Sequence, residues 1–153
     1  MSRRHGIALT PAEQREYLET SHTCILTTLD RHGYPHAVAM WFVVEPDGAV
    51  SMTTYGKSQK TLNARRDPRC AVLIESGRTY DELKGLLIRG QATVIGDSGQ
   101  VLDVLGRVHE KYNRGQASEV REALLAQARK RVIIRVPPER ISSWDHRKLA
   151  GTY

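Results

Sequence analysis

Hydrophobic and polar positions change period several times along the chain, and each change predicts a new element. Residues 10–13 read Thr-Pro-Ala-Glu, a capping box with proline at the first helical position, so we expect a short helix to about Glu19. Residues 23–29 are rich in β-branched side chains and predict a strand that ends at a glycine turn over residues 30–33. Before the helix, residues 1–8 are expected to form a loose basic arm.

The following segments predict an antiparallel meander. We expect a long strand from His36 to Glu45, a turn at residues 46–48 and a return strand from Ala49 to Thr54. A helix from about Gln59 to Arg66 should then end before a proline, because the residue that precedes proline avoids helical dihedral angles.

The rest of the chain continues the alternation of strands and helices. The pattern predicts strands over residues 69–75, 86–95 and 131–136, with 141–144 as an extension of the last, and helices over residues 101–112 and from a cap at Ser118 to about 128. About six antiparallel strands with three or four helices predict one mainly β domain over residues 1–153, a small β-barrel with flanking helices.

Composition narrows the possible partners. The net charge is +6, which favours an anion, whether nucleic acid, an acidic membrane or a phosphorylated small molecule. The longest apolar run, Ala37 to Val44, falls far short of the ~20 residues that span a bilayer, and no signal peptide is visible. Cys24 and Cys70 lie far apart without metal spacing, so we expect buried thiols in a cytoplasmic protein.

No catalytic motif stands out in the sequence. It contains no glycine-rich nucleotide loop, no His-Glu-x-x-His and no Gly-x-Ser-x-Gly elbow, and its histidines lack ligand spacing. We therefore expect no metal site and assign no catalytic residue.

Lysines flank the start of the helix expected at residue 59. Thr53 and Thr54 end a strand, a glycine turn follows, and Lys57, Ser58 and Lys60 stand at the helix N-terminus. A lysine there costs ~0.3–1 kcal/mol, because the positive end of the helix dipole lies at that terminus. A bound phosphate would offset this cost, because it can accept hydrogen bonds from the backbone N–H groups, the Ser58 hydroxyl and the ammonium groups of Lys57 and Lys60. A solvated basic surface explains the lysines equally well.

Large rings are concentrated in two places. Met40, Trp41 and Phe42 lie mid-strand, so alternation should bury one side in the core and leave the other to wall a planar ligand near Thr53 and Thr54. The tail holds Trp144, His146 and Arg147; a frayed basic end is the default, and folding over a partner subunit is the alternative.

Together these residues resemble the FMN-binding split-barrel superfamily of pyridoxamine 5′-phosphate oxidase-like proteins, above all its actinobacterial branch that uses the deazaflavin F420. The resemblance is carried by Gly33-Tyr34-Pro35, Met40-Trp41-Phe42, Lys57-Ser58-Gln59-Lys60, Asn63, residues 65–69 and residues 144–149.

The resemblance implies a split β-barrel that forms a homodimer with cofactor sites at its interface. Ser58 and Lys60 match a family Ser-Arg-Lys stretch that grips the FMN phosphate, whereas Gln59 stands where arginine is usual. By the same likeness the cofactor-binding residues also include Met40, Trp41, Phe42, Thr53, Thr54 and Lys57, with Trp144, His146 and Arg147 serving the other subunit.

The resemblance also implies an oxidoreductase that transfers a hydride between reduced F420 and a small conjugated or heteroaromatic substrate. F420 is favoured over FMN because Lys57, Lys60, Arg65, Arg66 and Arg69 cluster and one arginine of the FMN pattern is missing. The alternatives are an FMN-binding oxidase-like flavoprotein and a non-catalytic cofactor carrier. Nucleic-acid binding is disfavoured, since no such motif appears and the basic residues are not interleaved with aromatic ones.

Overall fold

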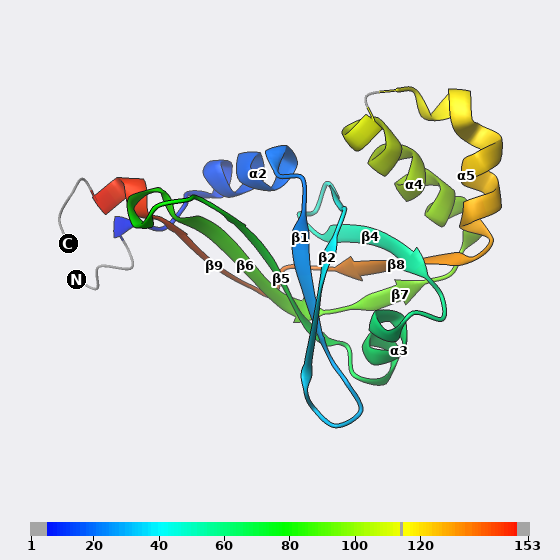
Figure 1. Cartoon of the computed structure of the whole chain (residues 1–153), viewed down its shortest axis with the longest axis horizontal. Coiled ribbons are helices and arrows are strands. Elements are labelled where there is room, and N and C mark those ends of the chain that lie inside the picture. The colour runs from blue at the N-terminus through cyan, green and yellow to red at the C-terminus, as the bar shows by residue number, and fades with distance from the viewer. Residues whose placement is uncertain (1–5, 114, 150–153) are drawn as a thin grey trace.

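Two antiparallel β-sheets form most of the molecule (Figure 1). The structure, a computed structural model, describes residues 6–113 and 115–149. The first sheet has the order β2-β1-β5-β6-β9, with β1 Cys24–Leu29, β2 Pro35–Met40, β5 Arg69–Ser76, β6 Lys84–Gln91 and β9 Arg140–Asp145. The second has the order β3-β4-β8-β7, with β3 Val43–Val44, β4 Val50–Tyr55, β8 Arg131–Val136 and β7 Thr93–Ile95. The expected mainly β fold is confirmed.

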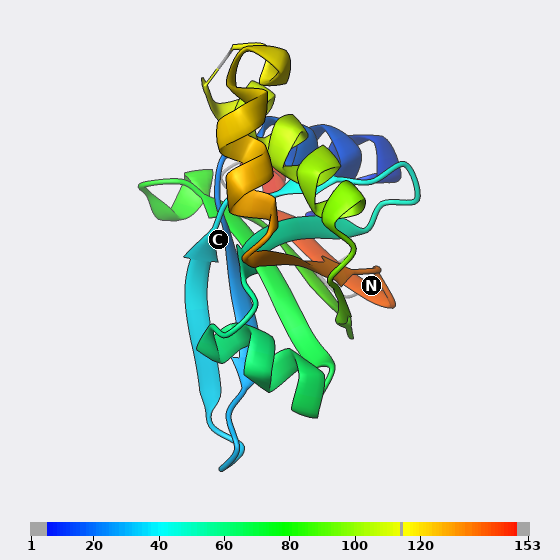
Figure 2. The same cartoon turned by 90° about the vertical axis from the view of Figure 1, so that its right-hand side faces the viewer.

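Helices cover the sheets at separate places. They are α2 Pro11–Thr20, α3 Gln59–Arg66, α4 Ser98–Asn113 and α5 Arg121–Ala128, with 3-10 turns η1 Tyr80–Glu82, η2 Ala117–Val120 and η3 His146–Leu149. Figure 2 shows α3 beside the projecting β1–β2 hairpin and the α4–α5 pair at the opposite end. Across the described ranges, no helix has the length and apolar character that a membrane crossing requires.

The local helix and turn signals are confirmed. The Thr10 amide donates to Glu13 Oε2 at 2.7 Å and the Glu13 amide donates to Thr10 Oγ1 at 3.3 Å, which completes the capping box of α2. Gly33 has a φ of 84°, the left-handed conformation that its turn requires. Helix α3 has the predicted bounds.

The strand predicted from His36 to Glu45 is wrong, because the chain changes sheets in its middle. Met40 still pairs with Cys24 in the first sheet, while Val43 pairs with Ser51 in the second. The meander predicted for residues 23–54 is therefore two hairpins in two sheets. The apolar run continues through the crossing because residues on both sides of it contact the core, so the hydrophobic pattern shows no break.

Two other strand predictions need the same correction. The segment 86–95 divides into β6 and β7, and residues 140–145 form β9 against β6 instead of extending β8. At the first division a Cβ on Gly90 would lie 2.2 Å from the Pro137 carbonyl oxygen, so the backbones can meet only at glycine. The described residues thus contain nine strands, not about six.

Two end-of-element predictions also change. Ser118 lies inside η2 and does not cap a helix; α5 begins three residues later at Arg121. The chain just before α2 is not loose, because Ile7 O accepts from the Asp145 amide at 2.8 Å and the Leu9 amide donates to Ser143 Oγ at 3.0 Å. The rest of the predicted arm, residues 1–5, lies outside the described residues.

The main core lies between the sheets, and a smaller one lies under α4 and α5. Fully buried members of the main core are Leu26, Phe42, Met52, Val72, Ile74, Leu86, Ile88 and Ile134. Cys24 belongs to it and Cys70 packs against it, and burial raises the pKa of these thiols to about 12 and about 11. Cys24 is buried as expected, whereas Cys70 is only half-buried and its thiol lies 3.5 Å from Gly90 O.

Gly85 supports the indole of Trp144, its register partner in β9. A Cβ on Gly85 would lie 2.1 Å from Trp144 Cζ2, so Gly85→Ala must displace a rigid ring. We expect a loss of roughly 1–3 kcal/mol in unfolding free energy, measured by urea denaturation. Gly96→Ala is the matched control, because a Cβ there meets nothing within 4 Å. Equal stability of the two variants would contradict this account of the contact.

Candidate functional site

The N-terminus of α3 holds a half-buried ammonium group. Lys60 Nζ donates to Thr54 Oγ1 at 3.2 Å, and the pKa of Lys60 is lowered by burial and by nearby Arg131. Ser58 occupies the N-cap position, but its hydroxyl contacts Thr54 Oγ1 at 3.3 Å and Thr61 Oγ1 at 3.0 Å and does not bond the helix backbone. The helix dipole and two cations thus meet where an acid would be favourable.

Gln59 turns its side chain along α3. Its Nε2 donates to Asn63 Oδ1 at 2.8 Å, and the fully buried Asn63 donates in turn to Thr28 Oγ1 at 3.1 Å. The residue that departs from the arginine pattern therefore forms part of the link between α3 and β1. Its cationic neighbours Lys57 and Lys60 remain at the helix start.

A cleft of about 440 Å³ joins elements that are distant in the sequence. Figure 1 shows α4 and α5 above the β4–β8 pair, and α3 below it. The cleft is lined by Ala39, Met40, Trp41, Thr53, Leu105, Val108, His109, Leu124, Gln127 and Arg131. Most of this lining is apolar, and none of it is acidic.

The five residues predicted on the second and third strands divide between the cleft and the interior. Met40, Trp41 and Thr53 line the cleft. Thr54 faces away from Thr53 and meets Lys60, as strand alternation requires. Phe42 is fully buried in the core, so its ring is not available to a ligand.

Helix α4 fastens the crossing between β2 and β3. Tyr112 Oη donates to Phe42 O and accepts from the Phe42 amide, both at 3.2 Å, and Lys111 Nζ also donates to Phe42 O at 3.2 Å. The Tyr112 ring is stacked on Trp41, with centroids 4.6 Å apart and planes 5° apart. We call Lys111 and Tyr112 on Phe42 the clasp; it holds the half-exposed Trp41 indole as a fixed wall.

Two residues of this region carry no sequence motif. Tyr55 and Arg131 face each other in the β4–β8 register, with the guanidinium 4.7 Å from the ring centroid. Arg131 Nε is buried and has no hydrogen-bond partner among the described residues. The basic run of residues 129–131 before a strand was the only sequence signal, and it does not reveal which strand it joins.

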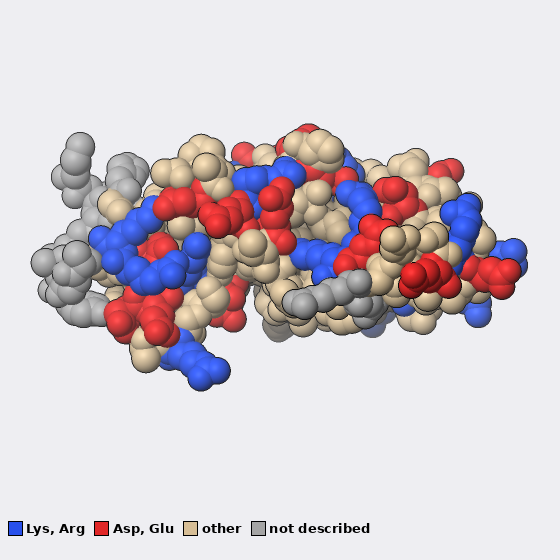
Figure 3. Space-filling view, turned by 90° about the horizontal axis from the view of Figure 1, so that it is seen from above, with Lys and Arg blue, Asp and Glu red and all other residues tan. Residues whose placement is uncertain are grey.

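Basic side chains extend from the cleft to the surface. A hollow of about 490 Å³ is lined by Tyr55, Gly56, Lys57, Arg129 and Lys130, and within the described chain its three cations form no ion pair. By contrast, the face that carries α2, α4 and α5 mixes both signs of charge (Figure 3).

Two of the clustered arginines are engaged elsewhere. Arg66 donates to Leu29 O and to Asn63 Oδ1, and Arg69 pairs with Asp67 at 2.6 Å. That pair lowers the pKa of Asp67 to about 2. The unpaired charge therefore centres on Lys57, Lys60 and the start of β8, not on residues 65–69 as a whole.

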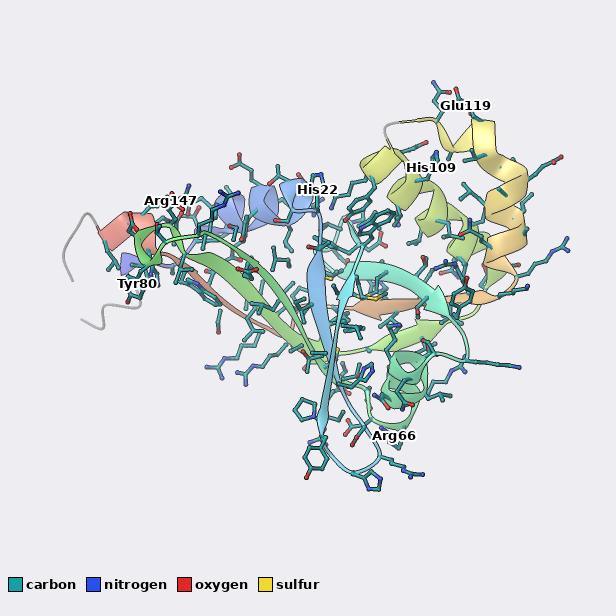
Figure 4. All side chains as sticks on the ribbon, in the orientation of Figure 1. His22, Arg66, Tyr80, His109, Glu119 and Arg147 are labelled. Carbon is teal, nitrogen blue, oxygen red and sulfur yellow. The ribbon has the colours of Figure 1, made fainter. Side chains whose placement is uncertain are left out.

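The tail residues lie at the other end of the same chain. Figure 4 shows Arg147 beside Tyr80, far from Arg66 and His109. His146 Nδ1 lies 2.7 Å from Tyr80 O, Arg147 pairs with Asp145 at 2.7 Å, and Trp144 covers Gly85. One chain alone therefore does not bring Trp144, His146 and Arg147 to the α3 site.

The other large clefts fit an anion less well. One of about 620 Å³ contains four acidic side chains, with Glu45 paired to Arg107 and Asp47 paired to Arg135. Among the described residues there is also no group of three His, Cys, Asp or Glu side chains able to hold a metal.

Comparison with known proteins gives a consistent result. Residues 10–145 match the family described as pyridoxamine 5′-phosphate oxidase. An F420H2-dependent biliverdin reductase of Mycobacterium tuberculosis is 31% identical over 126 residues, covering 82% of this chain and 81% of the relative.

Solved structures agree on the fold. A conserved hypothetical protein of Mycobacterium tuberculosis aligns with a TM-score of 0.92 and 35% identity over 100% of this chain and 95% of its own. An F420 reductase aligns with a TM-score of 0.68 and 23% identity over 87% and 98% of the two chains, which supports the fold alone. The expected split-barrel type is confirmed.

Proposed function

The chain belongs to the pyridoxamine 5′-phosphate oxidase family, and from this premise we propose that it is an F420-dependent oxidoreductase. It would transfer a hydride between the reduced cofactor and a small conjugated or heteroaromatic substrate. The observation that carries the proposal is the set of cations around the α3 N-terminus that form no ion pair with any described residue, next to a cleft walled by Trp41.

The residues present suit an anionic, flavin-type group. Lys57, Ser58 and Lys60 offer two ammonium groups and a hydroxyl at the dipole end of α3, where a phosphate is stabilised. Lys60 is held beside another cation, and a negative ligand would relieve that repulsion. A bound deazaflavin supplies the hydride chemistry. The protein binds and orients the ring and keeps water from it, with Met40, Trp41 and Thr53 as the wall.

F420 is preferred to FMN on charge. One phosphate needs two or three donors, yet Lys57, Arg129 and Lys130 line one hollow and Lys60 stands beside them at the start of α3, and none of the four forms an ion pair within the described chain. F420 carries a phosphodiester and a polyglutamate tail, which would use the additional cations. FMN, with its single phosphate, is the alternative cofactor.

We propose a homodimer on the outer face of the first sheet. The register places Ile25, Leu73 and Leu87 side by side on that face, opposite the core, and all three are only half-buried. Apolar side chains in a row of this kind are typical of a protein interface. Trp144, His146 and Arg147 of the partner subunit would then be available to the α3 site.

Titration of the purified protein with F420 and with FMN, followed by fluorescence, tests the proposal. We expect F420 to bind at micromolar concentration or tighter, more tightly than FMN, with an affinity that falls as salt rises. Biliverdin, the substrate of the relative, is the first conjugated acceptor to test with F420H2. Failure of both cofactors to bind would refute the proposal that the protein is an F420- or FMN-dependent enzyme. Binding without turnover of any acceptor would indicate a cofactor carrier.

A further inference from the structure

We propose that Arg131 recognises a carboxylate on the substrate, so that the cleft selects planar conjugated molecules that carry an acidic group. This inference rests on the proposed function. It adds that the substrate is negatively charged and that Arg131 binds its charged group.

Arg131 supplies the only fixed charge among the described residues that line the cleft. The other polar lining groups are Thr53, His109 and Gln127, and the rest are apolar. Its Nε is buried without a hydrogen-bond partner in the described chain. A buried donor left in this way is costly, so its retention points to a group that binds there. Carboxylate and phosphate both match the guanidinium fork with two parallel bonds, and the carboxylate is the smaller, planar anion that a flat body in this largely apolar cleft can carry.

Tyr55 presents that fork in a fixed orientation. The guanidinium lies over the Tyr55 ring at 4.7 Å from its centroid, an arrangement in which one face is covered and the N–H edge stays free. The ring is more than half exposed and stands at the end of β4, where the register sets it directly opposite Arg131. The donor is therefore positioned before a ligand arrives, which lowers the cost of binding.

The same cleft provides a surface for a flat conjugated body. The Trp41 indole is half-exposed and is held by its stack on Tyr112, so its position does not depend on a ligand. Leu105, Val108 and Leu124 cover the cleft from α4 and α5. A planar molecule lying along Trp41 would exclude water there and reach Arg131 with its acidic substituent.

Strand alternation places Arg131 and the Lys60 ammonium on opposite faces of β4. Thr54 turns toward α3 and accepts from Lys60, whereas Thr53 and Tyr55 turn to the opposite face of β4. Arg131 pairs with Tyr55 and shares that face, under α4 and α5. Lys60 and Arg131 thus approach β4 from its two faces, and Arg131 is still near enough to contribute to the lowered pKa of Lys60.

Biliverdin and its dimethyl ester form a probe pair that differs only in the two carboxylates. Binding of each would be measured by absorbance, with and without F420, in the wild type, Arg131→Gln, Arg131→Lys and the control Arg31→Gln. Arg31 is an exposed arginine in the turn between β1 and β2, outside the cleft and away from the proposed dimer face, and its replacement removes the same charge. Circular dichroism and the melting temperature would establish that each variant folds.

We expect the wild type and Arg31→Gln to bind the acid at least about tenfold more tightly than the ester. Arg131→Gln should weaken acid binding by roughly 10- to 100-fold and leave binding of the ester and of F420 nearly unchanged. Arg131→Lys should fall between, because it keeps the charge and loses the fork.

Three results would overturn the inference. They are equal binding of acid and ester by the wild type, absence of binding of either pigment, and an Arg131→Gln variant that loses F420 affinity while keeping the acid preference. The proposed function fails separately: if F420 does not bind while the acid preference still depends on Arg131, the role of Arg131 stands and the cofactor assignment falls.

Discussion

Replacement of Phe42 with alanine is expected to lower the free energy of unfolding by about 3–5 kcal/mol. The ring is fully buried where the two sheets meet, and no other phenylalanine occurs in the chain. Its loss leaves a cavity between the sheets and also removes the contact with the Lys111 ammonium, 4.0 Å from the ring centroid. The clasp bonds the Phe42 backbone, so the substitution removes the side chain alone.

Urea denaturation would measure this loss. Tyr34→Ala is a suitable control, because it removes another aromatic ring from a side chain that is 71% exposed at the hairpin tip. Its effect should stay within about 0.5 kcal/mol. A Phe42→Ala protein as stable as the control would show that the sheets are not joined through this ring.

Replacement of Lys60 with alanine should weaken cofactor binding by about 1.5–3 kcal/mol, the value of a charge-assisted hydrogen bond. The ammonium is half-buried beside Arg131, and among the described residues its hydrogen bond goes to the Thr54 hydroxyl, so a negative ligand would add a charge-assisted bond. Stability should not fall in parallel, since the ligand-free protein bears the cost of holding that charge there. This difference separates a binding role from a structural one.

Fluorescence titration with F420 and thermal unfolding of the same samples would test both statements. Lys84→Ala is the matched control; that ammonium lies 4.4 Å from the Tyr17 ring centroid, on the strand that pairs with the tail. Unchanged affinity in Lys60→Ala would remove Lys60 from the site. A large loss of stability would assign it to the fold instead.

Local signals in the sequence predicted local structure well. The capping box at Thr10 and the proline after Asp67 act within a few residues, so α2 and α3 were found with nearly correct ends. The crossings at Trp41 and Gly90 were not found, because a change of sheet alters which strand pairs and leaves the apolar pattern unbroken.

The site was predictable to the same extent. Lys57, Ser58 and Lys60 stand out because lysine conflicts with a helix N-terminus, a contradiction visible in the sequence. Arg131 could not be found in this way. Its proposed role depends on its pairing with Tyr55, which lies on β4, a strand far earlier in the chain. Pairing between distant strands is decided by the whole core, which no short motif encodes.

The clasp also bears on the order in which the chain can fold. The Phe42 amide bonds a hydroxyl 70 residues further along, so both strands at the crossing leave the ribosome well before their partner exists. Contacts of such long separation form late, because the loop between them must first be closed. Until then the Phe42 amide and carbonyl must form their hydrogen bonds with water. The sheet crossing and the cover of the cleft are thus completed in a single step, when α4 arrives.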